Sequence, residues 1–213
     1  VSEEEIDRAR PYGIDMAGLR AWGDTLGEDG AEQLIEDRVA ALRARYAGRA
    51  RGDAPVRTDL LALSGGGPDG AFGAGLLAGW TERGDRPEFT VMSGVSTGAI
   101  IALFAFLGPD HDATLREIYT TYRTRQLVIP TIFTGLLRGT ALLDASGYRR
   151  LIAQYITEAI VAAIAAEAAR DRVLLIGTTN IDASRPVIWN LTAIAASGHP
   201  DARTLIHDVI QAS

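Results

Sequence analysis

From Asp59 to Gly70 the chain reads Asp-Leu-Leu-Ala-Leu-Ser-Gly-Gly-Gly-Pro-Asp-Gly, and from Phe89 to Gly98 it reads Phe-Thr-Val-Met-Ser-Gly-Val-Ser-Thr-Gly. Each stretch begins with a short apolar run, which is typical of a strand, and continues into a turn rich in glycine. The small-residue segment 71–83 and the wholly apolar segment 99–107 follow these turns and predict helices, the second of them buried. Two consecutive strand–turn–helix units predict an α/β domain with a mostly parallel sheet.

The second turn, Gly94-Val95-Ser96-Thr97-Gly98, fits the pattern G-x-S-x-G. Glycines on both sides allow a sharp backbone turn that lifts the Ser96 hydroxyl above the edge of the sheet. A helix that begins near Thr97 would direct its free N–H groups and positive dipole end at this hydroxyl, so that negative charge is favoured there. Ser96 is therefore our candidate catalytic nucleophile. The simpler interpretation is a glycine-rich turn that contains an incidental serine.

The first turn carries three successive glycines, whose amides form a concave cluster of donors suited to an oxyanion. We assign the oxyanion hole to Gly65, Gly66 and Gly67, with the last two amides as the main donors because Pro68 has no N–H. The same glycines together with Gly70 also fit the dinucleotide-binding pattern G-x-G-x-x-G. That site needs an acidic residue at the end of the next strand, where this chain runs into the serine turn instead. We therefore reject a nucleotide cofactor.

A glycine triplet in one strand–turn–helix unit and a G-x-S-x-G turn in the next resemble, as a pair, the patatin-like lipid hydrolase family. The segments 142–146, before an expected helix, and 177–180, on an expected strand, resemble later parts of the same domain, so the resemblance covers residues 57–213. It implies a three-layer α/β/α sandwich that hydrolyses carboxylic esters of lipids without a metal or cofactor. It also implies a Ser–Asp dyad, in which an aspartate activates Ser96 and no histidine takes part.

Two features depart from the family pattern. Relatives carry Arg or Lys where this chain has Asp69, and that cation can hold an anionic head group. The reversed charge makes neutral esters or glycerides the more credible substrates, and we expect Asp69 to cap the following helix instead. The catalytic aspartate of the family lies in an Asp-Gly motif, and no Asp-Gly follows Ser96 in this sequence. Since residues 206–213 resemble the segment that shortly precedes this motif, we expect the base to lie beyond Ser213.

Two other interpretations of the sequence remain open, a Ser–Asp–His triad and a domain without catalytic activity. Ser96, Asp182 and His207 stand in the order Ser…Asp…His of α/β-hydrolase triads, and Asp182 is expected in a loop after a core strand. His207, however, lies within an amphipathic pattern that predicts a helix over residues 201–212, where a surface histidine is the simpler interpretation. The second alternative is a non-catalytic lipid-binding domain with the same fold.

Composition narrows the other function classes. The 213 residues include 21 Lys plus Arg and 27 Asp plus Glu and carry a net charge of -6. The sequence shows no basic face of the kind that would predict a nucleic-acid partner. The sequence has no cysteine, which excludes disulfides, cysteine-ligated zinc and a thiol nucleophile. Trp22 could touch a membrane surface, although no basic amphipathic face lies beside it.

We expect an N-terminal helical appendage and linker over residues 1–55, with a helical period over residues 31–46, and a hydrolase domain over residues 56–213. In that domain the patterns predict buried helices at 99–107 and 159–169, polar helices at 114–125 and 146–156, and strands at 59–64, 89–93, 173–180 and 187–191.

Overall fold

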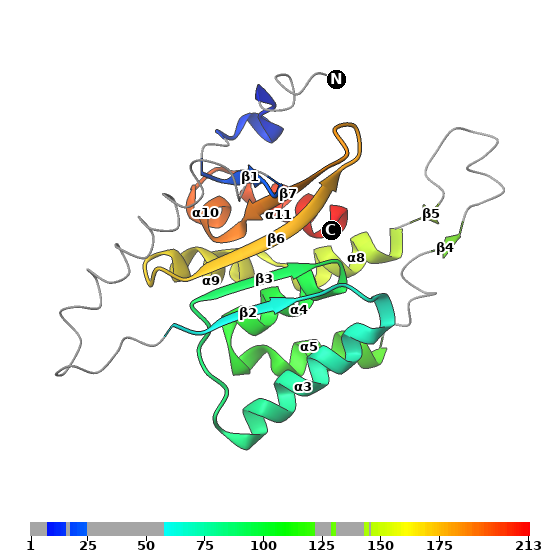
Figure 1. Cartoon of the computed structure of the whole chain (residues 1–213), viewed down its shortest axis with the longest axis vertical. Coiled ribbons are helices and arrows are strands. Elements are labelled where there is room, and N and C mark those ends of the chain that lie inside the picture. The colour runs from blue at the N-terminus through cyan, green and yellow to red at the C-terminus, as the bar shows by residue number, and fades with distance from the viewer. Residues whose placement is uncertain (1–7, 16–17, 25–57, 122–128, 131–142, 145) are drawn as a thin grey trace.

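A computed structural model describes residues 8–15, 18–24, 58–121, 129–130, 143–144 and 146–213 (Figure 1). The expected helical period 31–46 lies outside these residues. The strands are β1 (Arg20–Trp22), β2 (Leu60–Leu63), β3 (Val91–Val95), β4 (Ile129–Pro130), β5 (Leu143–Asp144), β6 (Val173–Asn180) and β7 (Arg185–Asn190). The α-helices are α3 (Gly70–Arg83), α4 (Thr97–Leu107), α5 (Asp112–Thr121), α8 (Ser146–Tyr155), α9 (Glu158–Ala168), α10 (Leu191–Ala196) and α11 (Ala202–Ala212), and short 3-10 turns span Pro11–Gly13, Gly67–Asp69 and Pro109–His111.

The main sheet has five strands in the order β1-β7-β6-β3-β2. Strands β2, β3 and β6 pair in parallel, β7 runs antiparallel to β6, and β1 runs antiparallel to β7. Strand β7 is therefore the single strand of this sheet that points the other way. The α/β fold class with a mostly parallel sheet is confirmed.

One face of this sheet forms the core. Met92, Leu174 and Ile176 on that face are completely buried, and all nine residues from Gly98 to Phe106 in α4 are buried with them. Figure 1 shows α3, α4 and α5 grouped beneath β2 and β3, and α10 and α11 beside β6 and β7. The prediction of a buried helix at 99–107 is confirmed. The helix predicted to be buried at 159–169 is α9, and it is less buried than α4, because only Val161 and Ile164 are buried on it.

A buried arginine ties several elements of the core together. The Arg172 side chain donates hydrogen bonds to the carbonyl oxygens of Phe89 (2.9 Å) and Phe106 (2.6 Å) and forms an ion pair with Glu167 (2.8 Å). These contacts join the residue before β6 to the segment before β3, to α4 and to α9. A buried charge is tolerated here because its donors have partners.

The observed element boundaries differ from the expected ones for identifiable reasons. Strand β3 runs to Val95, directly before Ser96, because its ladder to β6 continues to the pair Val95–Gly177. Strand β7 stops at Asn190, whose side chain accepts a hydrogen bond from the Ala193 amide (3.0 Å) and so begins α10, a helix that the sequence patterns did not predict.

Part of the expected N-terminal appendage belongs to the sheet. Arg20–Trp22 form β1 and pair with Val187–Trp189 of β7. The division of the chain into an appendage and a hydrolase domain stays a prediction. In the described part of the chain no single helix is long and apolar enough to cross a bilayer, although the bent pair 147–155 and 158–168 reaches that length and composition together.

Candidate active site

Ser96 lies in the tight turn between β3 and α4. Its backbone has φ 56° and ψ −128°, a conformation that non-glycine residues rarely adopt and that is a recognised form of local strain at functional turns. The expected helix start at Thr97 is confirmed. Gly98 allows this turn to lie tight against the neighbouring strand, because a Cβ there would be 2.5 Å from the carbonyl oxygens of both Leu63 and Ser64.

The structure brings the two glycine-rich turns together. Leu63 pairs with Gly94, so β2 and β3 end at the same edge of the sheet. A Cβ on Gly65 would lie 3.0 Å from the Cβ of Ser96 and 3.7 Å from its Oγ. Gly65, the first residue of the glycine triplet, therefore lies directly against the Ser96 side chain.

Gly66 and Gly67 have positive φ angles of 155° and 55°, which an L side chain would strain. Both residues are exposed, and no hydrogen bond joins either amide to another described residue. Two adjacent amides in this state are available to an oxygen that carries negative charge.

Ser213 also takes part in the turn, which the sequence patterns did not predict. Its Oγ accepts a hydrogen bond from the Ser96 amide (2.8 Å) and donates one to the Gly177 carbonyl oxygen (2.7 Å). The side chain thus links the turn to β6 at the end of α11. A separation of 117 residues between Ser96 and Ser213 leaves no local signal for this contact.

Thr97 is held by Tyr119 of α5. The two hydroxyls lie 2.5 Å apart, and the Tyr119 hydroxyl also donates to the Thr97 carbonyl oxygen (2.9 Å). Burial raises the pKa of Tyr119 to about 12, and the hydrogen bond with Thr97 opposes part of that rise. Tyr119 is therefore a neutral donor at physiological pH.

Asp69 occupies the N-cap position of α3, but its side chain makes no capping hydrogen bond. The expectation that it caps this helix is wrong. The Asp69 carboxylate is exposed on the glycine turn, and its Oδ2 lies 3.8 Å from the position of a Cβ on Gly66. The negative charge thus remains beside the proposed oxyanion hole.

The structure does not assemble the Ser–Asp–His alternative. His207 lies on α11, where its Nε2–H donates a hydrogen bond to the Ile156 carbonyl oxygen (2.7 Å). Asp182 is exposed in the turn between β6 and β7. Among the described residues neither side chain forms a hydrogen bond with Ser96. Asp144 precedes α8 in β5, and its side chain lies outside the described part.

No group of three His, Cys, Asp or Glu side chains suited to a metal ion occurs in the described ranges. The expectation of a reaction without metal or cofactor stays a prediction, because nothing else tests it.

Comparison with known sequences now identifies the family. A sequence model of the patatin-like phospholipase family matches residues 61–213, which is most of the chain. The chain belongs to this family. The α/β architecture with its mostly parallel five-stranded sheet is consistent with the patatin-like α/β/α fold. Neither the curated proteins nor the solved structures yield a match.

Membership of the patatin-like family supports lipid ester hydrolysis as the general activity and lipids as the substrates. The matched region begins within β2 and includes both glycine-rich turns, Ser96 and Ser213. Strand β1 and the segment before it lie outside the match.

Proposed function

We propose that the protein is a serine hydrolase that cleaves carboxylic esters of lipids, with Ser96 as the nucleophile and an aspartate as its base. The observation that carries this proposal is how closely Gly65 packs against Ser96, since a Cβ added to Gly65 would lie 3.0 Å from the Ser96 Cβ. Ser96 itself lies on a strained turn between a parallel strand and a buried helix. Acyl transfer requires a nucleophile and nearby amide donors, and this contact places the glycine turn beside the candidate nucleophile.

The reaction proceeds in two steps. The Ser96 Oγ attacks the ester carbonyl as the aspartate accepts its proton, and the glycine-triplet amides stabilise the negative oxygen of the tetrahedral intermediate. The intermediate collapses to an acyl-serine and releases the alcohol, which regains the proton. Water then gives a proton to the aspartate as it attacks the acyl-serine, and Ser96 takes this proton back as the fatty acid leaves. The amides of Gly66 and Gly67 suit this role because they are exposed and have no described partner.

A non-catalytic lipid-binding domain is the second candidate function. The observation that favours it is the surroundings of Ser96, where no described carboxylate forms a hydrogen bond with the serine. The Ser213 hydroxyl accepts the hydrogen bond of the Ser96 amide. A serine without a base is a weak nucleophile.

The test that separates the two candidates is the Ser96→Ala variant. We expect a fluorophosphonate probe to label the native protein at Ser96, and the variant to lose both the label and ester hydrolysis, by at least about 10³-fold in kcat. Ser93→Ala on the same strand is the matched control and should keep both. Hydrolysis that survives in Ser96→Ala would overturn the assignment of the nucleophile.

A further inference from the structure

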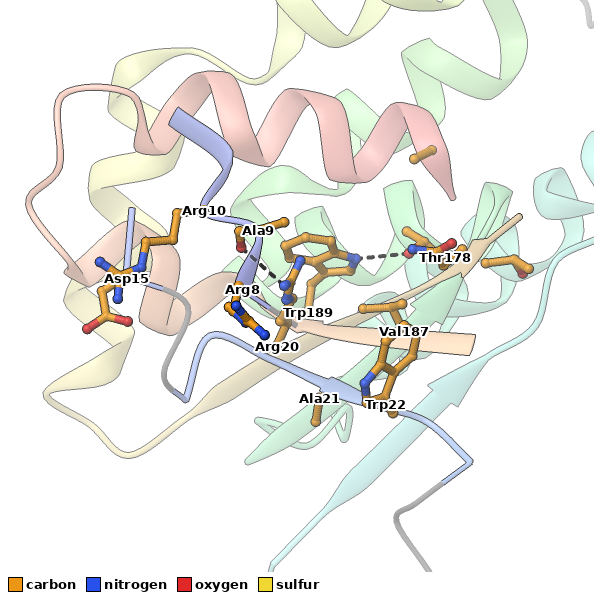
Figure 2. A pocket seen from close by; sticks show the side chains of 13 residues that line it. Arg8, Ala9, Arg10, Asp15, Arg20, Ala21, Trp22, Thr178, Val187 and Trp189 are labelled. Carbon is orange, nitrogen blue, oxygen red and sulfur yellow. Dashed lines mark hydrogen bonds between the residues drawn. The ribbon is translucent and has the colours of Figure 1, made fainter. Parts of the chain in front are cut away.

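A cavity of about 780 Å³ opens beside the serine turn, on the side of β6 and β7 (Figure 2). Its walls come from residues 8–15, from β1, from the ends of β6 and β7, and from Ala212. Ala212 precedes Ser213, and Thr178 follows Gly177, so two of its lining residues adjoin the hydrogen-bonded link to Ser96. A volume of this size is in the range of small-ligand sites.

The lining of the cavity is cationic in a chain that is acidic as a whole. Among the described residues, Arg8, Arg10 and Arg20 line it together with the carboxylate of Asp15, whereas the whole chain carries a net charge of -6. A concentration of guanidinium groups on an acidic protein favours a negatively charged ligand at that place.

The cavity also has an ordered aromatic wall. The Trp189 indole donates to the Thr178 hydroxyl (2.9 Å), and the Arg20 guanidinium lies 5.7 Å from the Trp189 ring centroid while it donates to the Ala9 carbonyl oxygen (3.1 Å). Figure 2 shows Arg20 placed between Ala9 and the indole. Trp22 lines the cavity too, and the Arg185 guanidinium packs 4.2 Å from its ring centroid. Both indoles are therefore fixed and offer apolar surface to a ligand.

We propose that this cavity binds an oxyanion, a phosphate or a carboxylate, carried on an apolar body. Guanidinium groups bind both anions through paired, charge-assisted hydrogen bonds, and the indoles accept the apolar part. This site is separate from the glycine triplet, which faces Ser96 from the β2 side, and binding in it does not depend on catalysis.

The two charged regions would also orient a lipid substrate. Asp69 alone favours neutral esters, but with Asp69 on the β2 side of Ser96 and the arginines on the β6–β7 side, an anionic amphiphile would place its charged end in the cavity. This orientation rests on the proposed function of Ser96, whereas the binding itself does not.

The binding test uses the Ser96→Ala protein, in which no ligand is consumed. Trp22 and Trp189 line the cavity, so their fluorescence reports on its occupation, and Trp80 against Phe89 provides a constant background. We expect saturable changes with dihexanoyl phosphatidic acid or with octanoate and none with octanol. The two anions represent phosphate and carboxylate ligands, and inorganic phosphate measures the contribution of the anion alone. Octanol that binds as well as both anions would overturn the proposal.

Charge variants test the arginines directly. Arg10→Gln should raise Kd about tenfold, the loss of roughly one charge-assisted contact, and added salt should weaken binding in the unmodified protein. Asp15→Asn should lower Kd several-fold, because it removes a negative charge from the described lining. Arg83→Gln, an exposed arginine at the end of α3, is the matched control and should bind normally. If Arg10→Gln and Asp15→Asn weaken binding alike, the two residues only support the structure and the proposal fails. If binding follows the prediction while Ser96→Ala retains ester hydrolysis, only the proposed function fails.

Discussion

Ser96 combines a strained backbone with a very close neighbour, and the geometry of its side chain depends on both. The turn holds φ at 56°, and Gly65 approaches so closely that a Cβ there would be 3.0 Å from the serine Cβ. In well-packed protein such a contact forces a shift of a few tenths of an ångström. A methyl group added at Gly65 is therefore expected to move the Ser96 side chain and so to change its alignment as a nucleophile.

We expect Gly65→Ala to lower kcat for a soluble ester by about 10- to 100-fold, because the added methyl group displaces Ser96 from its attacking position. The melting temperature should change little, since replacing glycine reduces the freedom of the unfolded chain by about 0.4–1 kcal/mol and offsets the local strain. The measurement is kcat together with thermal unfolding of the same preparation.

Gly75→Ala on α3 is the matched control. No atom lies within 4 Å of a Cβ at that position, so the change should stabilise the helix by about 0.5–1 kcal/mol and leave kcat as it was. Normal turnover in Gly65→Ala would contradict the close approach that supports the oxyanion-hole proposal.

At the residue scale, sequence reasoning succeeds where a conformation has a local cause. The serine turn and its helix start follow from neighbouring glycines, which is why Ser96 and Thr97 stand where we expected them. The Ser213 contact depends on how α11 packs against β6, and no local pattern encodes it. Asp69 shows the limit of a local rule, because a residue type that favours the N-cap occupies that position without making the capping bond.

At the element scale, α3 exposes apolar side chains next to the glycine triplet. Phe72 is 77% exposed and Leu76, one turn later, is 57% exposed. Among the glycines of this helix, Gly73 lies close to α4, since a Cβ there would be 3.2 Å from the Ile101 Cδ1, whereas the Cβ positions of Gly75 and Gly79 are open. The exposed side chains begin directly after the turn that faces Ser96. We infer that they contact the lipid surface that holds the substrates of the proposed hydrolysis.

We expect the double variant Phe72→Ser with Leu76→Ser to lose about tenfold or more of its activity on lipid vesicles, since burial of each side chain in lipid contributes roughly 1.5–3 kcal/mol. Activity on a dissolved short-chain ester should stay unchanged. Hydrolysis rates and vesicle co-sedimentation are the measurements.

Ile181→Ser provides the comparison, because Ile181 is 86% exposed on the β6–β7 turn and not on α3. If that variant loses as much vesicle activity as the α3 double variant, general surface hydrophobicity and not α3 makes the contact.

Elements with long, distinctive patterns could be predicted from the sequence, and short ones could not. Strand β6 spans the expected residues 173–180 because it is an apolar run buried in the centre of the sheet. Strand β1 has three residues, and only its pairing with β7 makes it a strand. This pairing is also why the cavity, which β1 helps to form, could not be foreseen from the sequence.

At the scale of the whole molecule, the inventory of titrating groups is unusually simple. The sequence contains no lysine and no cysteine, so its 21 basic residues are all arginine. Arginine keeps its proton to a pH above about 12, and histidine and the carboxyl groups titrate well below about 9. Between these limits the six tyrosines are the only side chains that change charge. Alkaline stability therefore reports on the surroundings of the tyrosines, because the hydrogen bond with Asp208 raises the pKa of Tyr12 and burial raises that of Tyr119.

Burial raises the pKa of Tyr119 to about 12, and burial together with the charge of Tyr119 raises the pKa of Tyr148. In the unfolded chain a tyrosine loses its proton near pH ~10. From that pH upward the unfolded state releases protons that the folded state retains, so the free energy of unfolding falls as the pH rises from about 10 to about 12. The stabilisation is fully present below pH ~10, and for Tyr119 it is on the order of 2 kcal/mol.

We expect urea unfolding between pH 9 and pH 12, the range of roughly normal to raised tyrosine pKa values, to show this loss in the native protein. Tyr119→Phe should flatten the slope, because phenylalanine has no proton to release in either state. The same variant should cost about 1 kcal/mol at neutral pH, where the hydrogen bonds to Thr97 are lost. Tyr148→Phe should flatten the slope further when it is combined with Tyr119→Phe. A slope that neither change alters would show that the two phenols reach water in the folded state, and that the contact between α5 and the start of α4 is looser than the hydrogen bonds of Tyr119 indicate.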